Sequence, residues 1–269
     1  MNARFALVHS GTAADLRFLH ALQGTAFLEE HLYHDPSMAE EMSLKQLPLT
    51  LIVATTPKNG IGHSGGLPWP MLKKEMAYFA RVTKRTPTTS VAGSILPEIS
   101  KQEDTDKKCS NVVIMGRKTW ESIPPKFRPL KDRTNLVVST KSRADLGNVP
   151  DTVVVGSSIT DCLNDLERRV KQGQAPPIGK AFVIGGSSIY EAALKMPQTK
   201  SILLTRIQQD YECDTHFPED VDRPESGWQR KTLEELRNFV GEDVSAEPLT
   251  DGSEDDQVSF EFRLYERQA

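Results

Sequence analysis

The sequence places one acidic residue on an otherwise apolar helix face, next to a glycine-rich loop. The loop Gly60–Gly66 leads through Trp69 to Glu75, and apolar periodicity predicts a helix over residues 71–84. One face of this helix carries Leu72, Glu75, Met76 and Phe79. A carboxylate on such a face costs several kcal/mol unless it is neutralised or paired. We therefore expect Glu75 to hold or protonate a ligand.

The glycine loop matches a dinucleotide fingerprint on paper, as Gly60-x-Gly62-x-x-Gly65. That fingerprint needs a helix opening at its third glycine, so that helix amides meet the pyrophosphate. Here Pro68 and Pro70 delay the helix. We reject the Rossmann interpretation and favour a loop beside a site, with an ordinary turn as the alternative.

Two other glycine junctions could bind phosphate. Gly116-Arg117-Lys118-Thr119 follows one expected strand, and Gly185-Gly186-Ser187-Ser188 follows another. Free N–H groups at the following helix starts attract anions. Together the junctions favour a dinucleotide ligand, although each is also a common strand–helix turn. Arg133 could pair with a carboxylate, or could be an ordinary surface arginine.

Short β-branched runs alternate with helical segments from Leu49 onward, which is typical of an α/β fold with a mostly parallel central sheet and flanking helices. The expected strands are Leu49–Thr56, Asn111–Met115, Asn135–Ser139, Thr152–Val155, Ala181–Ile184 and Ser201–Ile207. Helices are expected over residues 71–84, 117–122, 160–172 and 187–195. Residues 258–264 alternate with period two and predict an antiparallel C-terminal edge strand.

Composition limits the partners. A net charge of −4 over 269 residues gives no basic surplus for nucleic acid, and no apolar run is long enough to span a membrane. The three cysteines are widely spaced, which favours reduced thiols in an intracellular compartment over a disulfide framework. No Ser-His-Asp order or Walker lysine loop is present, so hydrolysis by a catalytic triad is unsupported. No paired-cysteine metal motif is present either, and we expect no metal site. His31-x-x-His34-Asp35 is interpreted as a solvated surface.

We expect two regions: an N-terminal extension over residues 1–47 and an α/β domain over residues 48–269. The extension is expected to be disordered or to reflect a misplaced start codon. Surface insertions are expected near residues 86–108 and 241–257, where apolar periodicity is absent. The domain is expected to be a cytoplasmic monomer, while Arg4 and Arg17 leave a mitochondrial presequence open.

Several ordered motifs between Leu49 and about Glu266 together resemble dihydrofolate reductase of the eukaryotic type. The resemblance rests on the following segments: Gly60–Trp69, the helix with Glu75 and Phe79, Ile114–Trp120 with Ser122–Pro124, Arg128–Lys131, Val183–Tyr190, Thr205–Ile207 and Asp214–Pro218. It implies NADPH-dependent reduction of 7,8-dihydrofolate to tetrahydrofolate for one-carbon metabolism, with sensitivity to antifolates such as methotrexate. It also implies a cis peptide between Gly185 and Gly186.

The resemblance further implies roles for single residues. Glu75 would orient the pterin and favour protonation of its N5, supported by Thr205 and by water ordered at Trp69. The substrate pocket would be formed by Met76, Phe79, Ile123 and Leu130, with Arg133 on the α-carboxylate of the glutamate tail. NADPH would be held by Ala54, Ile61, Arg117, Lys118, Thr119, Ser139, Thr140, Gly186, Ser187, Ser188, Ile189 and Tyr190.

The sequence departs from the family pattern at Met76, where an aromatic residue is common, and at Thr140, where a cation often selects the 2′-phosphate. Two alternative functions stay open. One is a non-catalytic pteridine- or nucleotide-binding relative, against which Glu75, Trp69 and Thr205 argue. The other is a reductase of the same fold that acts on a riboflavin precursor.

Overall fold

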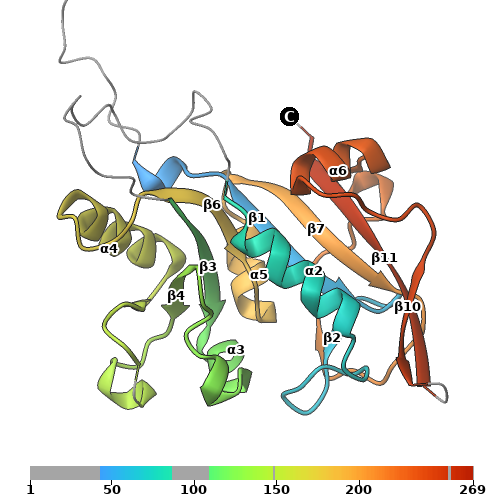
Figure 1. Cartoon of the computed structure of the whole chain (residues 1–269), viewed down its shortest axis with the longest axis horizontal. Coiled ribbons are helices and arrows are strands. Elements are labelled where there is room, and N and C mark those ends of the chain that lie inside the picture. The colour runs from blue at the N-terminus through green and yellow to red at the C-terminus, as the bar shows by residue number, and fades with distance from the viewer. Residues whose placement is uncertain (1–42, 87–108, 148, 254–255, 269) are drawn as a thin grey trace, which may run out of the picture. The chain divides into compact units, whose positions relative to one another are not determined.

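The computed structural model describes residues 43–86, 109–147, 149–253 and 256–268. Within these ranges one nine-stranded sheet forms the centre of the fold, in the order β10-β11-β7-β1-β6-β3-β4-β5, with β9 paired to β11 (Figure 1). The strands of this sheet are β1 Leu49–Thr55, β3 Ser110–Gly116, β4 Thr134–Val138, β5 Val154–Gly156, β6 Ile178–Val183, β7 Thr199–Ile207, β9 Trp228–Arg230, β10 Leu249–Ser253 and β11 Asp256–Arg267. A separate two-stranded ribbon joins β2 Gly60–Gly62 to β8 Thr215–His216.

The sheet is parallel from β7 to β5 and antiparallel where β11 joins β7. This confirms the mixed α/β architecture. β11 is not the outermost strand, however, because β10 and β9 both pair with its other side. β10 was not predicted because Leu249–Ser253 are mostly polar and lie in the stretch 241–257 that we interpreted as a loop.

Helices cover both faces of the sheet, and their bounds are α2 Lys73–Lys84, α3 Arg117–Ser122, α4 Ile159–Lys171, α5 Ser187–Leu194 and α6 Leu233–Val240. α4 and α5 pack on one face, together with inward residues such as Leu51 and Ile114. α2, α3 and α6 pack on the other face, against Ile52 and Val113. Successive strand residues thus point to opposite layers, as strand geometry requires. The central strand β3 is buried on both sides, which explains its continuous apolar run.

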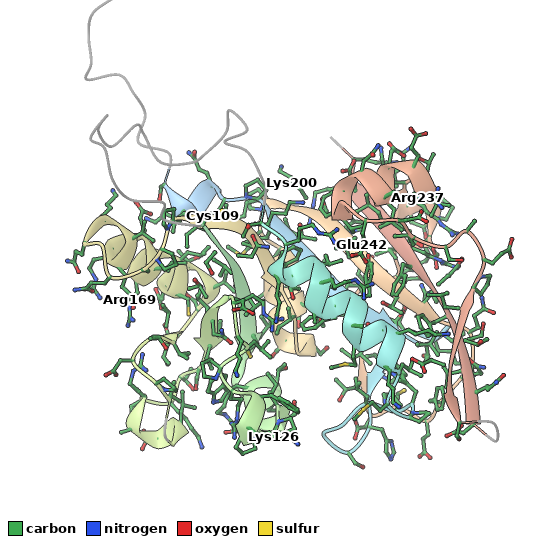
Figure 2. The ribbon with its side chains drawn as sticks, in the orientation of Figure 1. Cys109, Lys126, Arg169, Lys200, Arg237 and Glu242 are labelled. Atoms are coloured by element: carbon green, nitrogen blue, oxygen red, sulfur yellow. The ribbon has the colours of Figure 1, made fainter. Side chains whose placement is uncertain are left out.

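α6 was not predicted, although the sequence at its start carries a clear signal. Thr232 Oγ1 accepts a hydrogen bond from Glu235 N, and Glu235 Oε2 accepts one from Thr232 N, which is a capping box. Glu242, just beyond this helix, pairs with Arg81 and Arg85 of the α2 region. Figure 2 shows Glu242 beside α2, so this carboxylate ties α6 to the helix that carries Glu75.

The folded region includes Ser43–Leu47, which the sequence analysis assigned to the extension. A 3₁₀ turn spans Leu44–Gln46, and Leu44 and Leu47 are buried. Ser43 Oγ and Leu44 N donate to Glu167 Oε2 at 2.8 and 3.1 Å. The rest of the expected extension, the insertion over residues 87–108 and the His31–Asp35 motif lie outside the described residues.

No helix in the described part of the chain is long and apolar enough to cross a membrane. The same residues contain no cluster of three or more His, Cys, Asp or Glu side chains that could hold a metal ion.

Candidate functional site

A cavity of about 1300 Å³ opens at the carboxyl ends of the parallel strands. Its wall includes Ala54 of β1, Gly116 at the end of β3, Val138 at the end of β4 and Ile184 after β6. Ligands of open α/β sheets bind at this edge, where the strand ends leave a crevice between loops. α2, the glycine loop and the starts of α3 and α5 complete the wall.

Glu75 lies on the cavity wall in the first turn of α2. Thr205 Oγ1, from β7, donates a hydrogen bond to Glu75 Oε1 at 3.2 Å. Burial raises the pKa of Glu75 from its ordinary value of 4.5 to about 7, and the hydrogen bond from Thr205 only partly opposes this. Glu75 can therefore hold a proton near neutral pH and release it, as an acid–base group must.

The apolar face predicted around Glu75 is divided in the structure. Leu72 precedes α2 and is buried, whereas Met76 is 47% exposed and lines the cavity together with Phe79. The side of α2 that packs on the sheet carries Tyr78 and Val82, and the Tyr78 ring stacks on Phe262 with centroids 3.7 Å apart. Glu75 thus belongs to a ligand-facing surface of the helix rather than to its core-facing surface.

Because folding raises the pKa of Glu75, the folded protein binds a proton that the unfolded chain has already released between pH 4.5 and about 7. The contribution of Glu75 to wild-type stability should therefore fall as the pH rises through this window, and the fall should stop above it. Glu75→Gln has no carboxyl group to titrate, so its Tm should rise relative to the Tm of wild type from pH 4.5 upward.

Thermal unfolding across this window measures the difference, with Glu234→Gln as the control, since Glu234 is an exposed acid on α6. If the Tm of wild type instead rose relative to that of Glu75→Gln as the pH increased, the fold would favour the ionised carboxylate.

Thr205 and Trp69 do not line the cavity. Both are buried. Trp69 packs with Leu72, Ile207, Val258 and Phe260, and its ring meets the Tyr211 ring edge-on at 6.2 Å. The structure thus places Thr205 in contact with the acid, and it places Trp69 in the apolar support beneath the start of α2.

Arg133 stands on the cavity wall in a preset orientation. Its Nη1 donates to Thr83 Oγ1 at 2.8 Å, and its Nε donates to the carbonyl of Lys131 at 3.0 Å. The guanidinium lies 5.9 Å from the Phe79 ring centroid, and burial lowers its pKa. Apolar side chains also line the cavity, namely Met76, Phe79, Ile123 and Leu130. The cavity therefore suits a ligand with an apolar middle, a hydrogen-bonding group for Glu75 and a carboxylate for Arg133.

The two glycine junctions meet at another part of the cavity. Gly116 N donates to the carbonyl of Gly185 at 2.7 Å, and a Cβ on Gly116 would come within 2.8 Å of Ile189 Cγ1. Glycine is therefore required for the starts of α3 and α5 to approach. The peptide between Gly185 and Gly186 is cis, as the resemblance implied.

Side chains around these junctions are held by the fold. Arg117 Nη1 pairs with Glu121 Oε2 at 2.8 Å, one turn along α3. Ser187 Oγ donates to the carbonyl of His216 at 2.6 Å, and Tyr190 Oη donates to the carbonyl of Ile52 at 2.8 Å. The residues here that were expected to hold NADPH all line the cavity; they are Ala54, Ile61, Arg117, Lys118, Thr119, Ser139, Thr140, Gly186, Ser187, Ser188, Ile189 and Tyr190.

Other residues of the wall were not singled out from the sequence. Lys84, Lys126, Phe127 and Lys131 line the cavity together with Arg133. Lys126, labelled in Figure 2, lies in the segment after α3, with its ammonium 4.9 Å from the Phe127 ring centroid. Isolated lysines and one exposed phenylalanine carry no periodic signal, so only their place in the fold identifies them.

Comparisons with known proteins agree with this geometry. A family model described as dihydrofolate reductase matches residues 102–239. The dihydrofolate reductase of Pneumocystis carinii is 38% identical over 83% of this chain and 98% of that protein. The dihydrofolate reductase of Schizosaccharomyces pombe is also 38% identical, over 81% of this chain, but the match spans only 46% of that longer protein.

A solved structure is similar as well. The Schistosoma mansoni dihydrofolate reductase superposes with a TM-score of 0.59 and 30% identity, covering 82% of this chain and 98% of that one. The identity to full-length relatives and the match of the family model lead to one conclusion: the chain belongs to the dihydrofolate reductase family.

Proposed function

We propose that this cavity carries out the reaction of the family, the NADPH-dependent reduction of 7,8-dihydrofolate to 5,6,7,8-tetrahydrofolate. The observation that carries the proposal is Glu75, a half-buried acid with a pKa raised to about 7 that lines the same cavity as the two glycine junctions. The product supplies one-carbon metabolism.

The glycine junctions fit NADPH by their donor chemistry. The starts of α3 and α5 present backbone N–H groups to the cavity, and Lys118 and Arg117 add positive charge. When bound there, NADPH supplies the hydride that reduces C6 of the pterin. Arg117 is already paired with Glu121, so its charge would be shared between that carboxylate and a phosphate. Ser139 and Thr140 would add hydroxyl donors from the end of β4.

Glu75 would hold the pterin and supply its proton. The carboxylate can accept hydrogen bonds from the 2-amino group and ring N–H of the pterin, which fixes the ring against the nicotinamide position. Its raised pKa lets it carry a proton toward N5 through water. Thr205 would keep the carboxylate in place, and Trp69 would support this end of α2 from below.

The remainder of the substrate would follow the apolar wall. Met76, Phe79, Ile123 and Leu130 would enclose the pterin and benzoyl rings, and Arg133 would pair with the α-carboxylate of the glutamate tail. Antifolates that copy this shape would bind in the same place.

Oxidation of NADPH in the presence of dihydrofolate tests the proposed function directly. We expect dihydrofolate-dependent loss of NADPH absorbance that methotrexate abolishes. Dihydrofolate-independent oxidation, or none in a folded protein that binds both ligands, would contradict the assignment.

We further propose that the protein works as a cytoplasmic monomer. Large apolar side chains that are exposed in the described residues are Leu67, Met71, Met76 and Phe127, and all except Met71 line the cavity. Such exposure serves a ligand rather than a subunit interface. The three cysteines, Cys109, Cys162 and Cys213, are unpaired, which suits a reducing compartment.

All residues expected to bind substrate or cofactor lie between Ala54 and Thr205, so we propose that residues 1–42 form an extension separate from the catalytic domain. A chain starting at Met42 is expected to fold and to retain the kcat of the full chain. It should keep Ser43–Leu47, because Leu44 and Leu47 are buried. Turnover and Tm of both forms measure this. A matched chain starting at Leu49 should lose stability, since burying two leucines contributes several kcal/mol. An inactive or insoluble Met42 form would show that the extension completes the domain.

A further inference from the structure

Arg206 is a buried charged residue that the proposed mechanism does not use. It follows Thr205 on β7, and only 6% of it is exposed. Neighbouring strand residues point to opposite faces of a sheet, so Thr205 reaches Glu75 while Arg206 reaches away from it. A buried guanidinium is costly unless its donors are satisfied, so its partners indicate its role.

The partners of Arg206 come from two segments. Its Nη1 donates to Thr55 Oγ1 at 2.9 Å, to the carbonyl of Thr56 at 2.7 Å and to Asn59 Oδ1 at 3.2 Å. Its Nη2 donates to Asp222 Oδ2 at 2.7 Å. Asp222 is itself fixed by a hydrogen bond that it accepts from Tyr265 Oη, whereas Arg263 Nη1 reaches it only at 3.3 Å. Arg206 thus joins the end of β1 and the turn after it to an anchored carboxylate.

This turn is the root of the glycine loop. Thr56 N donates to the carbonyl of Gly60 and Gly60 N donates to Thr56 Oγ1, both at 2.9 Å. Asn59 has a φ of 60° and its carbonyl accepts from Phe217 N at 2.7 Å. β2 begins at Gly60, so Ile61 enters the cavity immediately after the turn that Arg206 holds.

The same root connects to the α5 start. β2 pairs with β8, and the carbonyl of His216 in β8 accepts the hydrogen bond from Ser187 Oγ. Both ends of this connection, Ile61 and Ser187, line the part of the cavity assigned to NADPH. Arg206, Thr55, Thr56, Asn59 and Asp222 themselves do not line it. Arg206 therefore cannot touch a ligand in the cavity, and its side-chain partners connect it to the cavity through the loop.

We propose that Arg206 is a positioning residue that sets the NADPH subsite by clamping the root of the glycine loop to Asp222. The inference rests on the proposed function, since that function assigns Ile61 and Ser187 to the cofactor. A guanidinium suits the task because its planar fork reaches several acceptors at once, whereas a lysine ammonium is a single point donor. A lysine at this position can contact Asp222 or the turn but cannot hold both.

The test compares Arg206→Lys and Asn59→Gly with the control Arg263→Lys. Arg263 contacts the same Asp222 at 3.3 Å, but its other hydrogen-bond partners, Glu261 and Tyr265, lie in β11 and not in the turn. Asn59→Gly removes the side-chain acceptor and keeps the positive φ accessible, because glycine adopts this conformation freely. The dissociation constants of NADPH and of dihydrofolate are measured separately by protein fluorescence, together with amide hydrogen exchange of residues 58–66 in the ligand-free protein.

Arg206→Lys is expected to weaken NADPH binding on the order of tenfold, equal to about 1.4 kcal/mol, with faster exchange in residues 58–66. Asn59→Gly should change both readouts in the same direction by less, and dihydrofolate binding should stay within about twofold in each. Arg263→Lys should leave both ligands and the loop exchange near wild type.

NADPH affinity and loop exchange that stay at wild-type values, beside a lowered Tm, would reduce Arg206 to a structural role and overturn the inference. Equal weakening of both ligands would overturn it as well. If Arg206→Lys does not fold, Asn59→Gly decides between the same outcomes. Failure of wild type to bind NADPH would instead contradict the proposed function, so the two failures are distinguishable.

Discussion

Glu75→Gln is expected to lower the turnover of dihydrofolate at least about a hundredfold, the usual range for a general acid–base group. Glutamine keeps the shape of the side chain, but it cannot carry the proton and presents an N–H where the pterin needs an acceptor. The loss should appear in the hydride step itself, because protonation of N5 makes C6 a better hydride acceptor. Stopped-flow measurement of NADPH oxidation isolates that step.

The pH dependence of the hydride-transfer rate tests the same role of Glu75. Burial raises the pKa of Glu75 to about 7, so its protonated fraction falls as the pH rises through neutrality. Wild-type hydride transfer should therefore slow by roughly tenfold per pH unit on the alkaline side. Glu75→Gln should show a flat profile at its low rate. Hydrogen bonds from the pterin favour the ionised form of Glu75. The midpoint of the pH profile should therefore lie at lower pH in the complex than in the free enzyme.

Thr205→Val is the matched control for this profile. The hydrogen bond from Thr205 lowers the pKa of Glu75, so its loss should move the midpoint to higher pH while leaving a proton-carrying acid in place. NADPH affinity should be near wild type in both variants, because the glycine junctions lie away from this face of α2. Near-normal turnover in Glu75→Gln would sink the mechanism, and an equal loss of NADPH binding would assign Glu75 a folding role.

Local pattern was sufficient to predict seven of the nine strands of the central sheet, all except β9 and β10, and the helices α2 to α5. The strands β1, β3 and β7 are buried on both faces, so their β-branched runs are continuous and unambiguous. α6 was missed although Thr232 and Glu235 form a capping box, because the sequence analysis searched for apolar runs and not for caps. β10 was missed because its polar residues gain their place only from pairing with β11.

The site was predictable as a set of residues but not as a set of contacts. Glu75 was identified from its position on an apolar face, yet its partner Thr205 lies 130 residues away. The clamp made by Arg206 leaves no periodic trace, since its partners Thr55, Asn59 and Asp222 lie in other segments and single charged residues occur throughout soluble chains. Contacts of this kind depend on the three-dimensional fold, which brings remote segments within hydrogen-bonding distance.

Arg133→Leu is expected to raise the KM for dihydrofolate far more than the KM for NADPH. The guanidinium is oriented before substrate arrives, since Thr83 and the carbonyl of Lys131 hold two of its nitrogens. A charge-assisted pair with the α-carboxylate, made in this partly buried position, should contribute on the order of 2–4 kcal/mol. Because the tail is remote from the reacting atoms, kcat should change much less than KM.

Two further variants separate charge from orientation. Thr83→Val keeps Arg133 but removes the hydroxyl that accepts a hydrogen bond from Arg133 Nη1. It should therefore weaken dihydrofolate binding by a smaller factor than Arg133→Leu. Arg81→Leu removes an equal charge from an exposed position on α2 that does not line the cavity, and it should leave both KM values near wild type. Steady-state kinetics with each ligand varied in turn measure all three. If Arg133→Leu raised both KM values equally, the guanidinium would act on the fold of the cavity rather than on the substrate tail.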